Sequence, residues 1–149
     1  METGMAMEAT APKVFLVEDD ESLRGAMERL LGLAGFSVVA YGSAEALLSE
    51  GAGESAACVV SDLRLPAMSG LELLAALRAH GWRAPLILIT AYDEPGLAER
   101  ATGLGAAGYL VKPFHGTALL DAVRAAIGPR GAATTTRPKE AGAGLRERE

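Results

Sequence analysis

The feature that most constrains the fold is a regular alternation of short apolar runs with segments of helical periodicity. The apolar runs are bounded by turn residues and are too short for buried helices, which is typical of strands covered on both faces of a parallel sheet. They occupy residues 13–17, 36–41, 57–62, 85–90 and 107–111. Helical patterns follow them at about residues 23–34, 43–50, 71–79, 93–104 and 115–127. Because parallel strands are joined by right-handed crossovers, the alternation predicts an α/β fold, a doubly wound parallel sheet with helices on both faces.

The alternation covers residues 13–128 and stops at both ends of the chain. Residues 1–12 carry no periodicity and predict a disordered leader. Residues 129–149 are small, polar and charged, and they predict a disordered tail. The 149 residues therefore fit one folded domain between two unstructured ends.

Composition excludes several functional classes. The net charge of −5 argues against a general affinity for nucleic acid or anionic lipid, so we expect neither a direct nucleic-acid partner nor membrane binding. No apolar run reaches the roughly 18 residues of a membrane span, and no signal-peptide pattern opens the chain. We therefore predict a cytoplasmic protein. The single cysteine, Cys58, lies in an apolar run and is expected to be a buried, inert thiol.

Polar side chains follow four of the five predicted strands. Glu18 and Asp19 follow the first, Asp62 ends the third, Thr90 ends the fourth and Lys112 follows the fifth. In a parallel sheet these ends share one edge, so three carboxylates would lie close together and repel one another. Lys112 offsets one charge only. The cluster therefore predicts a divalent cation, and its oxygen ligands favour Mg²⁺.

A carboxylate beside Mg²⁺, a lysine and a hydroxyl is suited to phosphoryl transfer. Asp62 could act as a nucleophile and form an acyl phosphate. The Lys112 ammonium and the cation would neutralise charge on the transferred oxygens. Thr90 could then bond to a phosphoryl oxygen that is absent beforehand, and one such contact can bias a two-state loop.

Residues 12–128 resemble the response-regulator receiver domain of bacterial two-component signalling. Glu18 and Asp19 match the family's acidic pair, Asp62 its phosphoacceptor and Thr90 its switch hydroxyl, and Lys112 opens the matching Lys-Pro-Phe segment. The run DLRLPAMSGLELL is most similar to receivers of the nitrogen-fixation-regulator type. The resemblance implies a flavodoxin-like five-stranded sheet of order 2-1-3-4-5.

The resemblance also implies roles for individual residues. Asp62 would take its phosphoryl group from a sensor histidine kinase or a histidine phosphotransfer protein. Mg²⁺ would be bound by Asp19, Asp62 and the backbone carbonyl of Arg64, with Glu18 standing where an aspartate is more common. The Lys112–Pro113 bond would be cis.

For several other residues near these motifs, two interpretations stay open. Tyr109 matches the family's rotating aromatic, a switch that acts with Thr90, but plain strand packing with a surface hydroxyl is the alternative. Arg64 and Tyr92 flank the predicted site and either tune the lifetime of the phosphoryl bond or are solvated. The two histidines, His80 and His115, are expected to be ordinary surface residues.

We therefore predict a stand-alone receiver rather than a turnover enzyme. Its only chemistry would be its own phosphorylation and autodephosphorylation. It would signal through the face formed by its fourth helix, fifth strand and fifth helix, to a downstream protein or a second copy in a phosphorylation-dependent homodimer.

One alternative is a fragment of a longer DNA-binding transcription factor. A second is a haloacid-type aspartyl phosphatase, which needs an aspartate where Arg64 stands. A third is a flavodoxin, whose phosphate loop would meet the acidic residues 18–21.

Overall fold

The computed structural model describes residues 11–51 and 55–128. The described strands form one five-stranded parallel sheet in the order β3-β2-β4-β5-β6. Their bounds are β2 Lys13–Val17, β3 Ser37–Tyr41, β4 Cys58–Asp62, β5 Leu86–Thr90 and β6 Gly108–Val111. If the strands are numbered from the first in the chain, β2, this order is 2-1-3-4-5, which confirms the predicted flavodoxin-like topology.

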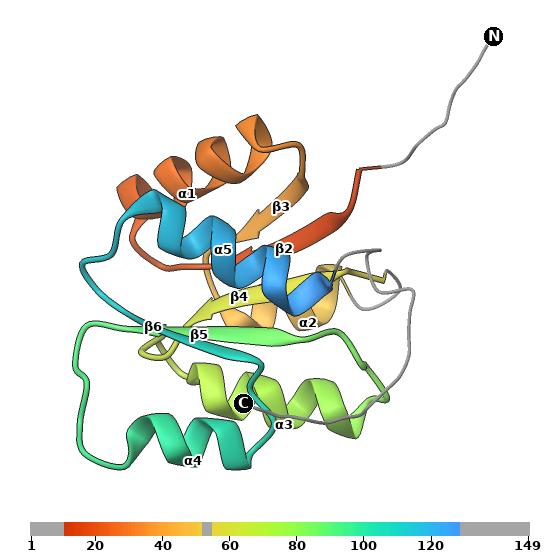
Figure 1. Ribbon diagram of the computed structural model, residues 1–149. Helices are drawn as coiled ribbons and strands as arrows, with labels where there is room; N and C mark the ends of the chain where they lie inside the picture. The colour runs from red at the N-terminus through yellow and green to blue at the C-terminus, as the bar shows by residue number, and fades with distance from the viewer. Residues whose placement is uncertain (1–10, 52–54, 129–149) are drawn as a thin grey trace, which may run out of the picture.

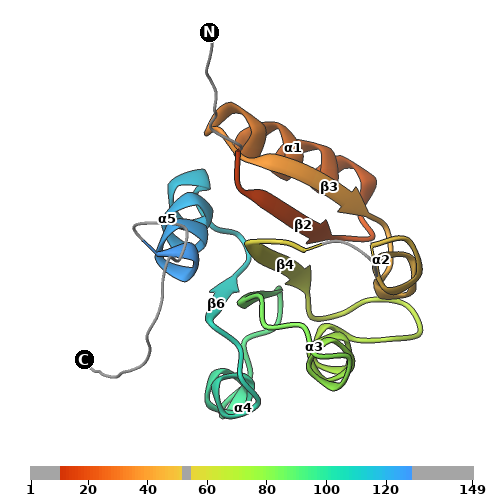
Figure 2. The same ribbon diagram turned by 90° about the vertical axis from the view of Figure 1, so that its right-hand side faces the viewer.

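Five helices cover the two faces of this sheet in the described part of the chain. Their bounds are α1 Glu21–Leu33, α2 Ala44–Glu50, α3 Gly70–Ala79, α4 Leu97–Gly103 and α5 Gly116–Ile127. Helices α1 and α5 lie on one face, and α2, α3 and α4 lie on the other (Figures 1 and 2). Among the described residues, no helix is both long and apolar enough to cross a bilayer.

Two hydrophobic cores follow from the alternation of side chains along each strand. In β2, Phe15 and Val17 face the core under α2, α3 and α4, whereas Val14 and Leu16 face the core under α1 and α5. The central strands β4 and β5 are buried at every residue, as a sheet covered on both faces requires. Cys58 is buried there with a free thiol, as predicted.

The end of α1 shows how helices pass into strands. Gly35 has φ +103°, a left-handed conformation that glycine adopts without steric cost. The N–H of Phe36 donates to the carbonyl of Leu31 and that of Gly35 to Gly32, which is the Schellman arrangement. Phe36 therefore belongs to the helix end rather than to β3, which begins one residue later than predicted. The same hydrogen-bond pattern ends α3 and α4.

The predicted start of the fourth helix is wrong. Asp93, Glu94 and Pro95 suit the first turn of a helix, but α4 begins only at Leu97. Gly96 precedes it with φ +84°, a left-handed residue that interrupts the helical backbone. Asp93 and Glu94 instead bond to side chains from elsewhere in the fold, described below.

The ends of the chain leave two predictions untested. The leader expected over residues 1–12 lies outside the described residues, apart from Ala11 and Pro12, which precede β2 without regular structure. The tail expected over residues 129–149 also lies outside them.

Candidate functional site

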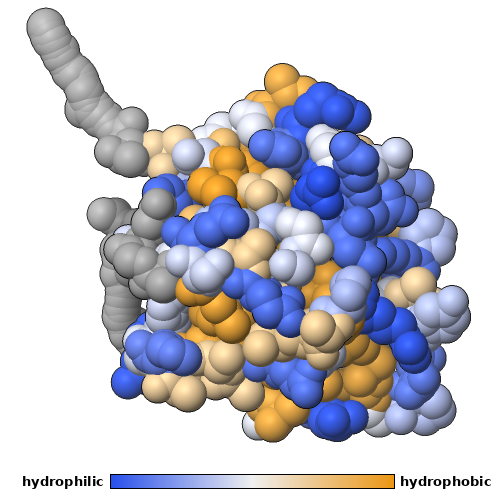
Figure 3. Space-filling model, turned by 180° about the vertical axis from the view of Figure 1, so that it is seen from behind, coloured by the Kyte–Doolittle hydropathy of each residue, from blue (hydrophilic) through white to orange (hydrophobic). Residues whose placement is uncertain are grey.

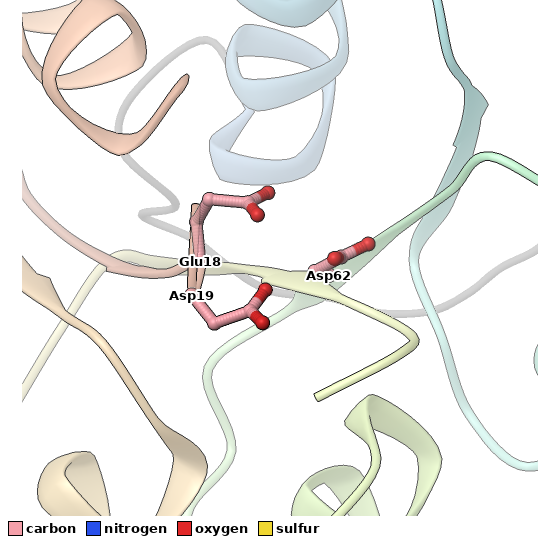
Figure 4. A group of neighbouring side chains, drawn as sticks. All are labelled: Glu18, Asp19 and Asp62. Carbon is pink, nitrogen blue, oxygen red and sulfur yellow. The ribbon is translucent and has the colours of Figure 1, made fainter. Parts of the chain in front are cut away.

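Three carboxylates meet where the C-terminal ends of β2 and β4 lie side by side. Glu18 and Asp19 directly follow β2, and Asp62 is the last residue of β4. Each offers an oxygen that lies within 4.8 Å of the other two. Figure 4 shows the three side chains pointing to the same side of the strand ends. Seen from behind, hydrophilic residues gather along the edge toward which the strands point, on the right of Figure 3.

Lys112 brings one positive charge to this cluster from the segment after β6. Its Nζ lies 3.3 Å from Oε1 of Glu18 and 3.4 Å from Oδ2 of Asp62. The Lys112 backbone N–H donates to the carbonyl of Thr90 at 2.7 Å, which ties this segment to the end of β5. The peptide bond between Lys112 and Pro113 is cis, the geometry that the resemblance implies.

Burial and charge act together on these groups. Glu18 is 1% exposed and Asp62 is 6% exposed, whereas Asp19 lies open to solvent. Burial, with the neighbouring Asp62 charge, raises the pKa of Glu18 despite its hydrogen bond from the N–H of Asp20. Burial also raises the pKa of Asp62, although Lys112 opposes the shift. Burial alone would lower the pKa of Lys112, but Asp62 and Glu18 raise it above its ordinary value.

The cluster holds three carboxylates and one ammonium, so Lys112 offsets only one of its negative charges. The pKa values of Glu18 and Asp62 are raised chiefly because burial disfavours their charged forms, and a neighbouring carboxylate adds to each shift. The donor atoms are all carboxylate oxygens, which are the ligands that hard divalent cations prefer. The residues present therefore fit a small divalent cation.

The backbone at Asp62 is packed tightly against the start of α3. A Cβ added at Gly70 would lie 2.5 Å from the carbonyl oxygen of Asp62 and 2.8 Å from a methyl group of Leu88. The N–H of Gly70 donates to the carbonyl of Leu63, and the hydroxyl of Ser61 donates to the carbonyl of Asp62. The carbonyl of Asp62 is thus held by the Ser61 hydroxyl and packed against Gly70, and the Gly70 N–H holds the carbonyl of the next residue.

The loop between β4 and α3 makes a tight turn just beyond the site. Ala67 has φ +66°, and the N–H of Met68 donates to the carbonyl of Pro66 at 2.7 Å. A hydrogen bond across one residue with positive φ is a γ-turn, which is rare and strained. Ser69 then caps α3 in a capping box with Glu72, a motif that the sequence reasoning did not use.

Thr90 is buried at the end of β5, but its hydroxyl is bonded to the Tyr92 backbone. The hydroxyl accepts from the N–H of Tyr92 at 3.0 Å and donates to the carbonyl of Tyr92 at 3.3 Å. The structure thus places Thr90 at the same sheet edge as Asp62 without a hydrogen bond between them. Its role toward a phosphoryl group stays a prediction.

Tyr109 lies on β6 with its ring against the core beneath α4. Its hydroxyl is at the surface and donates to Oδ1 of Asp93 at 3.0 Å. Burial, this hydrogen bond and the nearby carboxylates raise the pKa of Tyr109 to about 12. This arrangement matches the packing alternative for Tyr109, and the switch role stays a prediction.

The side chains of Arg64 and Tyr92 contact each other in a cation–π interaction. The Arg64 guanidinium lies 4.8 Å from the centre of the Tyr92 ring, and its Nη2 lies 3.6 Å from Oε2 of Glu94. All three side chains are exposed. His80 and His115 are also exposed, as predicted.

Sequence reasoning missed Arg24, which supports the cluster, and the partners of Asp93 and Glu94 in the loop after β5. The guanidinium of Arg24, on α1, donates to the backbone carbonyl of Glu18 at 2.9 Å. Asp93 and Glu94 were assigned to a helix and instead bond to Tyr109 and Arg64. Nothing in the local pattern marks these pairs, because the partners are separated in sequence and meet only in the folded chain.

Residues 14–124 match the protein family described as the response regulator receiver domain. The chain belongs to this family. The match confirms the family predicted from the motifs and covers every described strand except the first residue of β2.

Curated relatives of the chain are regulatory proteins by name. The response regulator protein FleR of Pseudomonas aeruginosa is 47% identical over 119 residues, which cover 79% of this chain and 25% of FleR. The transcriptional regulatory protein FixJ of Azorhizobium caulinodans is 40% identical over 115 residues, which cover 77% of this chain and 54% of FixJ. The chain thus spans between a quarter and about half of the length of these relatives.

Solved structures show the same fold. Full-length FixJ from B. japonicum has a TM-score of 0.73 at 34% identity, over 80% of this chain and 59% of that one. The chemotaxis protein CheY4 of Vibrio cholerae has a TM-score of 0.72 at 26% identity, over 78% of this chain and 99% of that one. Membership in a signalling family whose relatives are named as regulators favours signalling over the phosphatase and flavodoxin alternatives.

Proposed function

We propose that this chain accepts a phosphoryl group on Asp62 from a phosphohistidine of a sensor histidine kinase or a histidine phosphotransfer protein. The observation that carries the proposal is the meeting of Glu18, Asp19 and Asp62 with Lys112 at one edge of the sheet. A carboxylate oxygen of Asp62 would attack phosphorus, the donor's N–P bond would break, and the imidazole would leave. The product is an acyl phosphate.

We expect Glu18, Asp19, Asp62 and the backbone carbonyl of Arg64 to hold Mg²⁺. The bound ion would draw the donor's phosphoryl oxygens to the cluster and neutralise their charge. Lys112 would contribute a second positive charge, since its ammonium already lies 3.4 Å from Asp62. The chain would therefore catalyse its own phosphorylation and autodephosphorylation without acting as a turnover enzyme.

Thr90 supports a switch because its hydroxyl has a single proton to donate. At present the proton is directed at the carbonyl of Tyr92. A phosphoryl oxygen on Asp62 would be a stronger, charged acceptor, and the hydroxyl would turn toward it. The segment from Tyr92 to Asp93 would then lose a tether, and the hydrogen bond from Tyr109 to Asp93 lies next along the chain.

The elements moved by such a switch are α4, β6 and α5, the fourth helix, fifth strand and fifth helix along the chain. We propose that this face binds a downstream protein or a second copy of the chain after phosphorylation, in the cytoplasm and without direct nucleic-acid contact by the receiver itself. A pre-existing equilibrium between two arrangements would be shifted toward the binding one.

The relatives favour a second candidate. FleR and FixJ are much longer than the matched region, so this receiver could equally control a DNA-binding part of a longer transcriptional regulator. The reading frame that follows residue 149 in the gene distinguishes the two.

The test of the phosphoacceptor site is incubation with acetyl phosphate and Mg²⁺, followed by intact mass measurement. We expect the wild type to gain one phosphoryl group and Asp62→Asn to gain none. Chelation of Mg²⁺ should abolish the gain. If the wild type gains nothing, the activity is wrong; if Asp62→Asn is still labelled, the site is wrong.

A further inference from the structure

The side chain of Arg24, in the first half of α1, holds the start of the acidic segment that follows β2, and the first hydrogen bond of α1 holds its end. The backbone N–H of Arg24 donates to the carbonyl of Asp20 at 2.8 Å. Its guanidinium Nη1 donates to the carbonyl of Glu18 at 2.9 Å. The N–H of Glu18 also donates to the carbonyl of Tyr41, so the segment is anchored to β3 as well. Of these contacts, only the bond to the Glu18 carbonyl depends on the Arg24 side chain, and it holds the residue directly before Asp19.

The guanidinium of Arg24 lies next to Gly42, a residue without a side chain. A Cβ added at Gly42 would lie 3.4 Å from Nη1 of Arg24. Arg24 can therefore extend across the turn after β3 and still reach the end of β2. Its side chain connects three elements that are separate in the sequence.

Among the three carboxylates, Asp19 depends most on the contact between the Arg24 side chain and the end of β2. Glu18 and Asp62 both pair with Lys112, whereas the carboxylate of Asp19 makes no hydrogen bond or ion pair within residues 11–51 and 55–128. The place of the Asp19 carboxylate is therefore set by its own backbone. That backbone lies between the Glu18 carbonyl, which the Arg24 guanidinium holds, and the Asp20 carbonyl, which accepts the first hydrogen bond of α1.

We infer that Arg24 is a positioning residue that sets the affinity of the acidic cluster for a divalent cation. The inference rests on the proposed function, because it takes Mg²⁺ as the ligand. Two effects of Arg24 oppose each other. A fixed backbone places Asp19 before the ion arrives, whereas the guanidinium charge repels the ion.

The magnitudes decide between these effects. Groups that hold a metal ligand in place typically change metal affinity by about 10- to 100-fold when they are lost. One half-exposed charge facing solvent is weakened by water and salt. Positioning is therefore the larger effect, and loss of Arg24 weakens binding.

The test is a Mg²⁺ titration of the full chain by calorimetry, without a phosphoryl donor. Arg24→Ala should raise the Kd for Mg²⁺ about tenfold, and Arg24→Lys, which can still donate to the Glu18 carbonyl, should recover most of the loss. Arg29→Ala, on the same helix, is the matched control and should bind like the wild type. An unchanged or lower Kd in Arg24→Ala overturns the inference.

A second variant separates position from charge. Gly42→Val keeps the Arg24 charge but fills the space over which its guanidinium lies. It should also raise the Kd for Mg²⁺, and wild-type binding in this variant would contradict the inference.

Kinetics with acetyl phosphate distinguish positioning from general damage to the fold. In Arg24→Ala, the Mg²⁺ concentration for half-maximal labelling should rise about tenfold, while the rate at saturating Mg²⁺ stays at the wild-type level. A lower saturating rate with unchanged half-saturation overturns the inference. Asp19→Asn separates the two proposals: if it binds Mg²⁺ like the wild type, the proposed cation site is wrong, whereas if it is weakened and Arg24→Ala is not, only the role of Arg24 is wrong.

Discussion

Asp62 carries a charge that its surroundings disfavour. Its side chain is nearly inaccessible, burial raises its pKa, and Asp19 adds to the shift while Lys112 opposes it. A residue selected for folding alone would be neutral at this position. The Asp62 carboxylate therefore lowers the stability of the fold, as expected of a residue with the chemical role that we propose for it.

Replacement of this charge should stabilise the metal-free protein. We predict that Asp62→Asn raises the free energy of unfolding by about 1 kcal/mol at pH 7. A raised folded-state pKa means that the contribution of Asp62 to stability is present below its ordinary value of 3.8 and is lost as the pH rises through the folded-state value. The gain should therefore shrink at pH 4. Urea unfolding in EDTA at both pH values measures it, and a less stable variant at pH 7 would contradict the argument.

Cys58 is a residue whose environment removes reactivity. Burial raises the pKa of the Cys58 thiol to about 12, so the nucleophilic thiolate is scarce near neutral pH. We predict that a disulfide reagent such as DTNB leaves the folded protein unmodified at pH 8 and reacts with one thiol after unfolding in guanidinium. Rapid reaction of the native protein would show that β4 opens more readily than its burial implies.

At the scale of elements, the connection between β4 and α3 packs directly against the backbone of a site residue, Asp62. The first residue of α3 lies against the carbonyl of Asp62, and only the absence of a side chain at Gly70 permits this approach. The loop also contains a left-handed alanine, Ala67. Strain of this kind is tolerated where the surrounding structure requires a particular geometry.

We predict that Gly70→Ala destabilises the protein by about 2 kcal/mol, because an added methyl group overpacks the site. Labelling of Asp62 by acetyl phosphate should fall with it, since the Asp62 backbone must move. The matched control is Gly32→Ala in α1, where an added Cβ has nothing within 4 Å. The control should gain about 0.5–1 kcal/mol from helix propensity. Thermal unfolding of the two variants checks the difference, and equal effects would refute the role of close packing.

At the scale of the whole molecule, the sheet makes the site by bringing distant segments together. Its two cores hold β2, β4, β5 and β6 in register, so the residues after β2 and β6 meet the end of β4. A cation bound at this edge would join these segments and should therefore stabilise the fold as a unit.

We predict that Mg²⁺ raises the free energy of unfolding by about 2.7 kcal/mol when its concentration is 100 times the Kd. The reason is that the unfolded chain does not assemble the three carboxylates. EDTA should remove the gain, and Asp19→Asn should reduce it. Unfolding midpoints across a Mg²⁺ series measure the effect, and a midpoint independent of Mg²⁺ would exclude a cation site of useful affinity.

Much of the fold could be predicted because its information is local. Apolar runs, helical spacing and terminators such as Gly35 each act over a few residues, and they agree on one topology. The start of α4 could not be predicted in this way. Asp93 and Glu94 have a local preference for a helix start, but the left-handed Gly96 interrupts the helical backbone and their side chains contact Tyr109 and Arg64 instead.

The sequence by itself determined the order of the elements, the strand ends that carry polar groups, and therefore which residues could share an edge. Only the tertiary structure decided how those residues interact: that Lys112 bridges Glu18 and Asp62, that the Thr90 hydroxyl is bonded to Tyr92, and that Arg24 reaches the Glu18 carbonyl. The physical reason is range. Periodicity and turn chemistry act between neighbours along the chain, whereas hydrogen bonds and ion pairs between side chains depend on distances of a few ångströms that exist only after the sheet has formed.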